Sequence, residues 1–361
     1  MSTFTQQIAS VRGRAARTNT SGRYESDTRE AFDDGWTPDD VEPTQLATTV
    51  TAEKAKVIIT RNDSPDIGFS ASINPYRGCE HGCIYCYARP AHAYMGLSPG
   101  LDFESKLFFK PEAAHLLEGE LSSPRYIPEV IHIGGNTDPY QPQERRLRIT
   151  RQVIEVLSRF NHPFSVISKS GLILRDLDLI AHMAQRNLVR VAISITTLDR
   201  KLARSMEPRA ATPEKRLDAV KRLADAGVPT VVMFAPCIPG LNDHEMEAVL
   251  ERAAAAGAHG AGYVSLRLPM EIADLFQEWL ATDHPDRASR VMSLVRQMRG
   301  GKTYDSQWGK RMKGEGPIAA ITSRRFAAAK VRYGLNAKLQ PLDLTLFGVP
   351  PKAGGQIDLF G

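Results

Sequence analysis

The chain has 361 residues, of which 42% are hydrophobic, and it carries a net charge of +5. This length allows one large domain or two small ones, each with a substantial buried core. No stretch approaches the ~20 apolar residues that span a bilayer, and the N-terminus lacks the apolar segment of a secretory signal, so we predict a cytoplasmic protein without membrane association.

Residues 1–55 are predicted to form an extended N-terminal arm, because they are polar and show little apolar periodicity. From residue 56 onward, short β-branched runs alternate with longer amphipathic stretches. The expected strands lie at 56–60, 71–75, 130–134, 164–168, 190–195, 230–235 and 263–266, and the expected helices at 143–160, 174–185, 213–226 and 243–256. This alternation predicts an α/β fold, a partial (β/α)6 TIM-type barrel over residues 56–283 with an N-terminal extension and a C-terminal helical segment.

Three of the four cysteines fall within eight residues, directly after the strand expected at 71–75. They are Cys79, Cys83 and Cys86, in the pattern C-x-x-x-C-x-x-C. Three thiolates on one tight loop can hold three irons of a [4Fe–4S] cluster and leave the fourth iron open to a small molecule. A zinc site completed by His81 or His92 is the alternative, although structural zinc usually takes two separated pairs of ligands.

Polar residues follow most of the other expected strands. They are Gly135, Asn136, Thr137 and Asp138 after the strand at 130–134, Lys169 after 164–168, Ser194 and Thr196 at the end of 190–195, and Arg267 after 263–266. Functional residues of such barrels cluster where the strands end, so we expect a polar ring around one mouth. The glycine allows close backbone approach to a ligand, the lysine can meet a carboxylate, and the hydroxyls can bind a ribose. Any one of these residues alone would be an ordinary loop or cap residue.

The segments 74–89, 137–144 and 239–243 together resemble an uncharacterised group of the radical S-adenosylmethionine (SAM) superfamily that is related to spore photoproduct lyase. The resemblance implies a [4Fe–4S] cluster whose open iron binds SAM, and an electron from a donor such as flavodoxin or ferredoxin that cleaves SAM to a 5′-deoxyadenosyl radical. It also implies that Lys169 and Ser194 contact SAM and that Asn136 or Thr137 lies near its amino group.

The chain departs from the lyase at the hydrogen-atom donor. The lyase carries a further cysteine a few dozen residues past its cluster, whereas this chain has none between Cys86 and Cys237. Cys237, at the end of the strand at 230–235, is one candidate donor, and Tyr87 and Tyr140 are others. The alternative for Cys237 is a small buried thiol that acts as an apolar residue.

Residues 284–338 are predicted to form a basic helical segment. Between residues 287 and 338 there are thirteen lysines and arginines and only two acidic residues, with Tyr304, Trp308, Phe326 and Tyr333 interleaved. Basic side chains can neutralise phosphates while aromatic rings stack on unpaired bases, so the segment is a candidate nucleic-acid surface. A solvated helical face explains the same pattern, and both interpretations remain open.

The last segment, 339–361, is predicted to be a flexible tail. It ends in Gln-Ile-Asp-Leu-Phe-Gly, which resembles the pentapeptide by which bacterial polymerases and repair factors bind the DNA sliding clamp. In that interpretation Gln356 forms hydrogen bonds, while Leu359 and Phe360 fill an apolar pocket. Alternatively, the tail folds back so that Phe347 and its apolar neighbours cap the barrel.

Together these features predict a metal-binding, iron–sulfur radical SAM enzyme that is lyase-like or performs another radical transformation. Its expected substrate is a nucleic acid, and DNA repair is the favoured function. A radical SAM enzyme that modifies RNA or a protein is one alternative. The other is a non-catalytic iron–sulfur protein that is tethered to DNA through the clamp.

Overall fold

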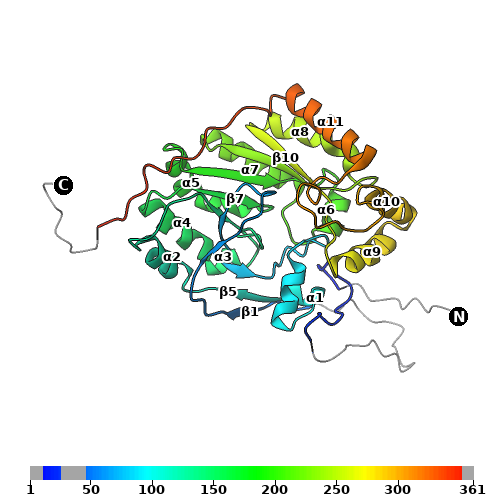
Figure 1. Cartoon of the computed structure of the whole chain (residues 1–361), viewed down its shortest axis with the longest axis horizontal. Helices are drawn as coiled ribbons and strands as arrows, with labels where there is room; N and C mark the ends of the chain where they lie inside the picture. The colour runs from blue at the N-terminus through cyan, green and yellow to red at the C-terminus, as the bar shows by residue number, and fades with distance from the viewer. Residues whose placement is uncertain (1–10, 26–45, 352–361) are drawn as a thin grey trace.

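The computed structural model describes residues 11–25 and 46–351. Its centre is a seven-stranded sheet in the order β10-β9-β8-β7-β6-β3-β2 (Figure 1). Neighbouring strands from β3 to β10 are parallel, and β2 runs antiparallel to β3 at the edge. The strands are β2 (Ile59–Arg61), β3 (Ala71–Ile73), β6 (Ile131–Ile133), β7 (Phe164–Ser168), β8 (Val189–Ser194), β9 (Thr230–Cys237) and β10 (Gly260–Ser265). Six parallel strands added in chain order confirm the predicted partial barrel.

Helices connect these parallel strands and cover the outside of the sheet (Figure 1). They are α3 (Glu144–Leu147), α4 (Ile149–Arg159), η2 (Gly171–Asp176), α5 (Leu177–Ala184), α6 (Arg200–Met206), α7 (Pro213–Asp225), η3 (Asp243–Glu245) and α8 (Met246–Ala255). The helix expected at 143–160 is divided at Arg148, whose φ of 55° interrupts the helical backbone between α3 and α4.

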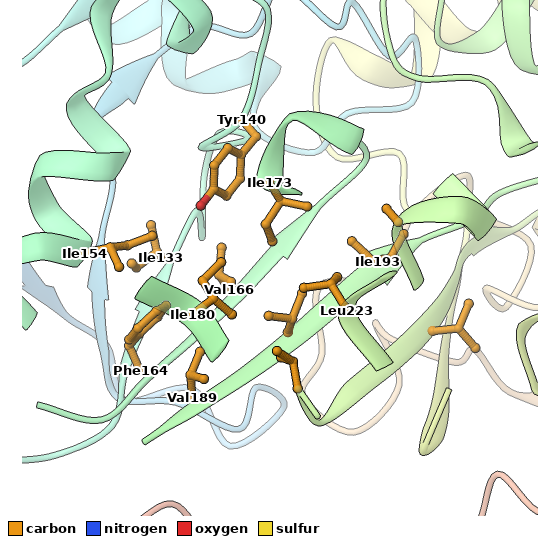
Figure 2. Close-up of a cluster of buried hydrophobic side chains, with 14 of the residues drawn as sticks. Ile133, Tyr140, Ile154, Phe164, Val166, Ile173, Ile180, Val189, Ile193 and Leu223 are labelled. Atoms are coloured by element: carbon orange, nitrogen blue, oxygen red, sulfur yellow. The ribbon is translucent and has the colours of Figure 1, made fainter. Parts of the chain in front are cut away.

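The two faces of the sheet differ in burial. Outward-facing residues such as Phe164 and Val166 are completely buried against the helices, as Figure 2 shows. Ser165, Ile167 and Met233 alternate with the outward-facing positions of their strands and are only partly buried. A closed TIM barrel fills its interior with bulky side chains. Here the inward-facing side chains Ser165, Ile167 and Met233 keep partial solvent exposure.

A second, smaller sheet lies beside the barrel in the order β1-β5-β4. Its strands are β1 (Thr49–Ala52), β5 (Lys106–Phe109) and β4 (Tyr76–Arg77), and η1 (Arg89–Met95), α1 (Leu101–Ser105) and α2 (Ala113–Leu121) follow β4 or β5 in the chain. The sequence did not predict this sheet, because its strands are short and β1 falls in the polar segment predicted to be an arm. The sheet packs beside the loop that carries the three cysteines.

The predicted basic segment contains α10 (Pro285–Gln297) and α11 (Gly316–Arg332), after α9 (Ile272–Asp283). Part of its charge is paired with carboxylates from other parts of the chain, since Arg311 contacts Asp66 at 2.6 Å and Arg325 contacts Glu247 at 2.7 Å. Phe326 is buried against β10 and cannot stack on a base, whereas the indole of Trp308 is about half exposed. None of the helices in the described ranges is long and apolar enough to cross a membrane.

After α11 the chain runs back along the N-terminal ends of the barrel strands (Figure 1). We call residues 336–348 the C-terminal strap. Arg190 donates to the carbonyl of Gln340 at 2.6 Å, and the backbone N–H of Gly348 donates to the carbonyl of Phe160 at 3.0 Å. The ring of Phe347 packs on Tyr126, Phe160 and His162. Phe347 therefore caps the barrel floor, while Gln356, Leu359 and Phe360 lie outside the described residues.

His162 beneath the strap predicts an acid-sensitive contact. Its ring is completely buried, with Nε2 2.7 Å from the Tyr126 hydroxyl, and burial lowers its pKa to about 4. Since this value lies below the ordinary ~6.5, the stability from neutral His162 is present above pH 6.5 and is lost as the pH falls towards 4. We expect His162→Gln to reduce the loss of unfolding free energy between pH 7 and pH 4 by up to about 3 kcal/mol.

Chemical denaturation at the two pH values measures this effect. His115→Gln, at an exposed position on α2, is the control and should follow the wild type. A His162→Gln variant whose stability falls with acid as steeply as the wild type would contradict the assignment.

Candidate functional site

The three clustered cysteines lie on a loop of residues 79–86, the cysteine loop, which begins just after β4. The backbone N–H of Cys79 donates to the carbonyl of Phe103 on α1, and that of Ile84 donates to the carbonyl of Met206 on α6, both at 3.0 Å. Gly78 makes the turn into the loop with a φ of 72°. The loop is therefore held between two helices from different parts of the chain.

All three thiols are free, and two of them are buried. Burial raises the pKa of Cys79, and the nearby carboxylate of Asp138 and the thiols of Cys83 and Cys86 raise it further. Burial also raises the pKa of Cys83 and Cys86, while the ammonium of Lys169 acts on both in the opposite direction. The three thiols therefore influence one another, and Lys169 acts on the last two of them.

This arrangement fits an iron–sulfur cluster better than a single zinc ion. Within the described residues, no three His, Cys, Asp or Glu side chains are placed to hold one metal ion. A [4Fe–4S] cluster takes each thiolate on a different iron, so its ligands need not converge on one point. The two histidines of the zinc alternative are engaged elsewhere: Nδ1 of His81 lies 3.3 Å from the carboxylate of Asp138, and Nε2 of His92 lies 3.0 Å from the Lys106 carbonyl.

The residues predicted after β6 lie beside the cysteine loop. The backbone N–H of Asn136 donates to the side-chain oxygen of Asn74 at 2.7 Å, and the hydroxyl of Thr137 donates to the carbonyl of Tyr76 at 3.2 Å. Gly135 lies over β3, since a Cβ added to it would be in van der Waals contact with the Ser72 side chain at 3.7 Å. The turn after β6 is thus fastened to the segment that leads into the cysteines.

Asp138 joins three parts of the site. Its carboxylate accepts hydrogen bonds from the hydroxyl of Ser168 and the backbone N–H of Lys169, both at 2.7 Å, and it faces His81. Burial alone would raise the pKa of Asp138, but these three partners together lower it to about 2. Asp138 is therefore an anion at neutral pH whose oxygens hold neighbouring loops, and its contact with a cofactor stays a prediction.

Lys169 follows β7 and lies over the aromatic ring of Tyr85, with Nζ 5.8 Å from the ring centroid. Tyr85 belongs to the cysteine loop, between Cys83 and Cys86. A flexible ammonium beside the three thiols provides a positive charge for an anionic group of a ligand. The structure thus brings Lys169 and the cysteines together.

The hydroxyls predicted after β8 take part in a buried network. Thr196 is completely buried and donates to the carboxylate of Glu207 at 2.6 Å, and Glu207 also accepts from Tyr85 and pairs with Arg216. Ser194 donates to the carbonyl of Ala235 at 3.1 Å. Thr196 is therefore linked to the cysteine loop through Glu207, which also accepts a hydrogen bond from Tyr85.

Sequence reasoning missed Glu207 and Arg216. Both side chains are at least 98% buried, although one directly follows α6 and the other lies on α7. The sequence holds the two charges nine positions apart, but charged residues in helical segments are usually solvated. No pattern in the sequence separates this pair from the many exposed pairs.

Tyr87 and Arg267 meet at the mouth of the barrel. The Tyr87 hydroxyl donates to the carbonyl of Gly135, and the guanidinium carbon of Arg267 lies 5.2 Å from the centroid of the Tyr87 ring. Tyr87 is about half exposed. These contacts bring together predicted residues from the ends of β6 and β10 and from the end of the cysteine loop.

Cys237 and Tyr140 lie elsewhere. Cys237 is buried in the main hydrophobic core, and its pKa is raised to about 12 by burial, with smaller effects from Asp243, Arg325 and Glu247. Tyr140 is completely buried in the same core (Figure 2). Both side chains are packed in the hydrophobic core, so we do not propose them as hydrogen-atom donors.

The fold is a partial α/β barrel in which polar residues follow the ends of the parallel strands. Residues 73–253, half of the chain, match the radical SAM superfamily, and the chain belongs to that superfamily. This confirms the family predicted from the cysteine motif. The superfamily uses a [4Fe–4S] cluster and SAM.

Two relatives are similar in sequence. An uncharacterised protein of Mycobacterium tuberculosis is 39% identical over 230 residues, which cover 63% of this chain and 68% of that protein. An uncharacterised protein of Methanocaldococcus jannaschii is 29% identical over 192 residues, 53% of this chain and 69% of the relative.

Solved structures of spore photoproduct lyase share the fold. One, of a tyrosine-to-phenylalanine mutant of the lyase, superposes with a TM-score of 0.51 at 13% identity and covers 79% of this chain and 78% of its own. The lyase complexed with dinucleoside spore photoproduct gives a TM-score of 0.51 at 14% identity, with the same coverage. At this identity the likeness establishes the architecture alone.

Proposed function

We propose that Cys79, Cys83 and Cys86 hold a [4Fe–4S] cluster and that the enzyme acts with SAM on a nucleic acid, in DNA repair. When bound, cluster and SAM supply a radical that removes a hydrogen atom from the substrate. The observation that carries the proposal is the group of three free thiols on one loop, with Lys169 over Tyr85 of that loop and near Cys83 and Cys86.

In this proposal the strand ends bind SAM. Lys169 pairs with the carboxylate of SAM, and backbone carbonyls around Gly135 and Asn136 accept hydrogen bonds from the ammonium group of SAM. Ser194, at the end of β8, is assigned to the ribose, and Arg267 lies over Tyr87. Asp138, Thr137 and Thr196 position these groups through the hydrogen bonds described above.

Lys169→Ala should weaken SAM binding while leaving the cluster in place. A hydrogen bond to a charged group is worth about 1.5–3 kcal/mol, so we expect the Kd for SAM to rise roughly tenfold or more. Equilibrium binding to the reconstituted protein measures the change. Lys201→Ala, at an exposed position on α6, is the control, and equal affinities in the two variants would remove Lys169 from the site.

Tyr87 is the hydrogen-atom donor that we retain. It is partly exposed at the mouth, it directly follows Cys86, and its hydroxyl contacts the turn that we assign to SAM. The ordinary pKa of a tyrosine is about 10, so the hydroxyl keeps its proton at neutral pH. A tyrosine that stays protonated can give up a hydrogen atom.

Two observations support a nucleic-acid substrate. The first is the fold shared with a lyase whose structure contains a dinucleoside photoproduct. The second is a group of exposed basic residues on and after α10, namely Arg287, Arg290, Arg296 and Lys302. The half-exposed Trp308 follows them in the chain. Such a surface can neutralise phosphates, and its binding should weaken as salt increases.

We further propose the partners that this activity needs. A low-potential donor such as flavodoxin or ferredoxin would supply the electron, and a reducing cytoplasm would keep the thiols available. The tail residues Gln356, Leu359 and Phe360 would bind the sliding clamp. A tail peptide that binds purified clamp, and loses binding on Phe360→Ala, is the expected result; an unchanged affinity would refute clamp binding.

The proposal is tested by reducing the anaerobically reconstituted protein in the presence of SAM and measuring 5′-deoxyadenosine. We expect the product to form, and to form faster with DNA than without it. Complete absence of product with an intact cluster would favour the non-catalytic iron–sulfur protein. Acceleration by RNA or protein alone would redirect the substrate assignment.

A further inference from the structure

A buried carboxylate links the described N-terminal residues to the helix beside the cysteine loop. Glu104 lies on α1 and is completely buried. Its Oε1 accepts the backbone N–H of Ala16 at 2.9 Å and a guanidinium N–H of Arg89 at 2.5 Å. Its Oε2 accepts the backbone N–H of Ala15 at 3.1 Å. Both oxygens of Glu104 are therefore acceptors.

Arg89 carries this link into the cysteine loop. It is completely buried, and its Nε donates to the carbonyl of Cys83 at 2.9 Å while Nη2 donates to that of Gly82 at 3.1 Å. Its Nη1 donates to the carbonyls of Pro99 and Gly100, both at 3.0 Å. With the contact to Glu104, all five N–H groups of the guanidinium are used. Arg89 thus fixes two carbonyls in the middle of the cysteine loop.

Glu104 and the cysteine loop also touch directly. Gly82 has a φ of +68°, and a Cβ at this position would lie only 2.7 Å from Oε2 of Glu104. A glycine between the first two cysteines is therefore required for the carboxylate to approach. Glycine is the residue that tolerates both the close approach and the positive φ.

Residues 11–25, which we call the N-terminal segment, form one wall of the same region. Ala15 and Ala16 are buried in a hydrophobic core that also contains Cys83 and Tyr85. Arg14 donates to the backbone carbonyl of Glu104 at 2.5 Å. The segment therefore packs against the cysteine loop through apolar contacts as well as through Glu104.

We infer that Glu104 is a positioning residue that locks the N-terminal segment and the cysteine loop together, so that this segment encloses the cluster site. The inference rests on the proposed cluster binding. An amide cannot replace the carboxylate, because its NH2 group would face the N–H of Ala15 or those of Ala16 and Arg89. Groups that orient metal-binding residues are often as necessary as the ligands themselves.

The test compares Glu104→Gln with Asp176→Asn. Asp176 is equally buried and also paired with arginines, Arg151 and Arg175, but it lies in η2, outside the cluster site. Two readouts are used: the rate of cluster loss in air after reconstitution, and the rate of trypsin cleavage at Arg12, Arg14 and Arg17 in cluster-free protein.

We expect Glu104→Gln to lose its cluster roughly tenfold faster than the wild type, since changes around metal ligands typically weaken binding 10–100-fold. Its N-terminal segment should also be cleaved severalfold faster, while Asp176→Asn matches the wild type in both readouts. If Glu104→Gln does not fold, Arg14→Met should show faster cluster loss and faster cleavage at Arg12 and Arg17, because it loosens the N-terminal segment without touching the cysteine loop.

Wild-type behaviour of Glu104→Gln in both readouts would overturn the inference. Equal losses in Glu104→Gln and Asp176→Asn would also overturn it, since they would show general destabilisation. A wild-type protein that holds no cluster would instead contradict the proposed function, and trypsin protection in cluster-free protein would still test the link between the segment and Glu104.

Discussion

Cys83→Ala should abolish both cluster binding and SAM cleavage. We expect the reconstituted wild type to hold about four irons per chain, as a [4Fe–4S] cluster requires, and the variant to hold few or none. The physical reason is that the two remaining thiolates, on Cys79 and Cys86, leave two irons of the cluster without protein ligands. Iron and sulfide content, the visible absorption spectrum and 5′-deoxyadenosine formation measure the effect.

Cys237→Ala is the matched control, because it removes the same group from a buried position outside the site. We expect it to keep its iron and its SAM cleavage, with a loss of about 1 kcal/mol in unfolding free energy. Loss of iron in Cys237→Ala, or its retention in Cys83→Ala, would contradict the assignment of the three ligands.

Arg216→Met should cause a large loss of stability. Arg216 is buried beside the buried carboxylate of Glu207, and it also donates to the carbonyl of Ser194 at 3.1 Å. Removing one partner of a buried ion pair costs about 3–5 kcal/mol, because the other charge stays buried without compensation. Since Glu207 also accepts from Tyr85 and Thr196, the cysteine loop should lose order with it.

Denaturant unfolding of the cluster-free protein measures this loss. The control is Lys221→Met, whose exposed pair with Asp225 should contribute less than about 1 kcal/mol. Similar unfolding free energies for the two variants would show that the buried pair does not stabilise the fold.

The barrel could be predicted from sequence because its signal is repeated. Each parallel strand is a short apolar run followed by an amphipathic helix, and β7 was predicted with its observed bounds. The β1-β5-β4 sheet gives no such signal. Its strands are two to four residues long, and β1 lies in a polar segment. The strand that pairs with β1 is β5, which is more than fifty residues away in the chain.

The site was predictable where its reactive residues are close together in the sequence or directly follow a predicted strand. The three cysteines are close in sequence, and Lys169 follows a strand whose end is fixed by the fold. Glu104 and Glu207 were not predictable, because their function depends on contacts with Ala15, Ala16 and Tyr85 that only the folded chain creates. Burial of a charge is a tertiary property, and no local pattern reports it.

The most direct test of the central proposal follows the hydrogen atom itself. Reduced wild-type protein is incubated with SAM and with deuterium-labelled DNA that has been irradiated with ultraviolet light. A parallel reaction contains labelled RNA. The 5′-deoxyadenosine from each reaction is analysed by mass spectrometry. We predict that deuterium from DNA enters the product and that Cys83→Ala gives neither product nor label. Product without deuterium from either nucleic acid would contradict a nucleic-acid substrate.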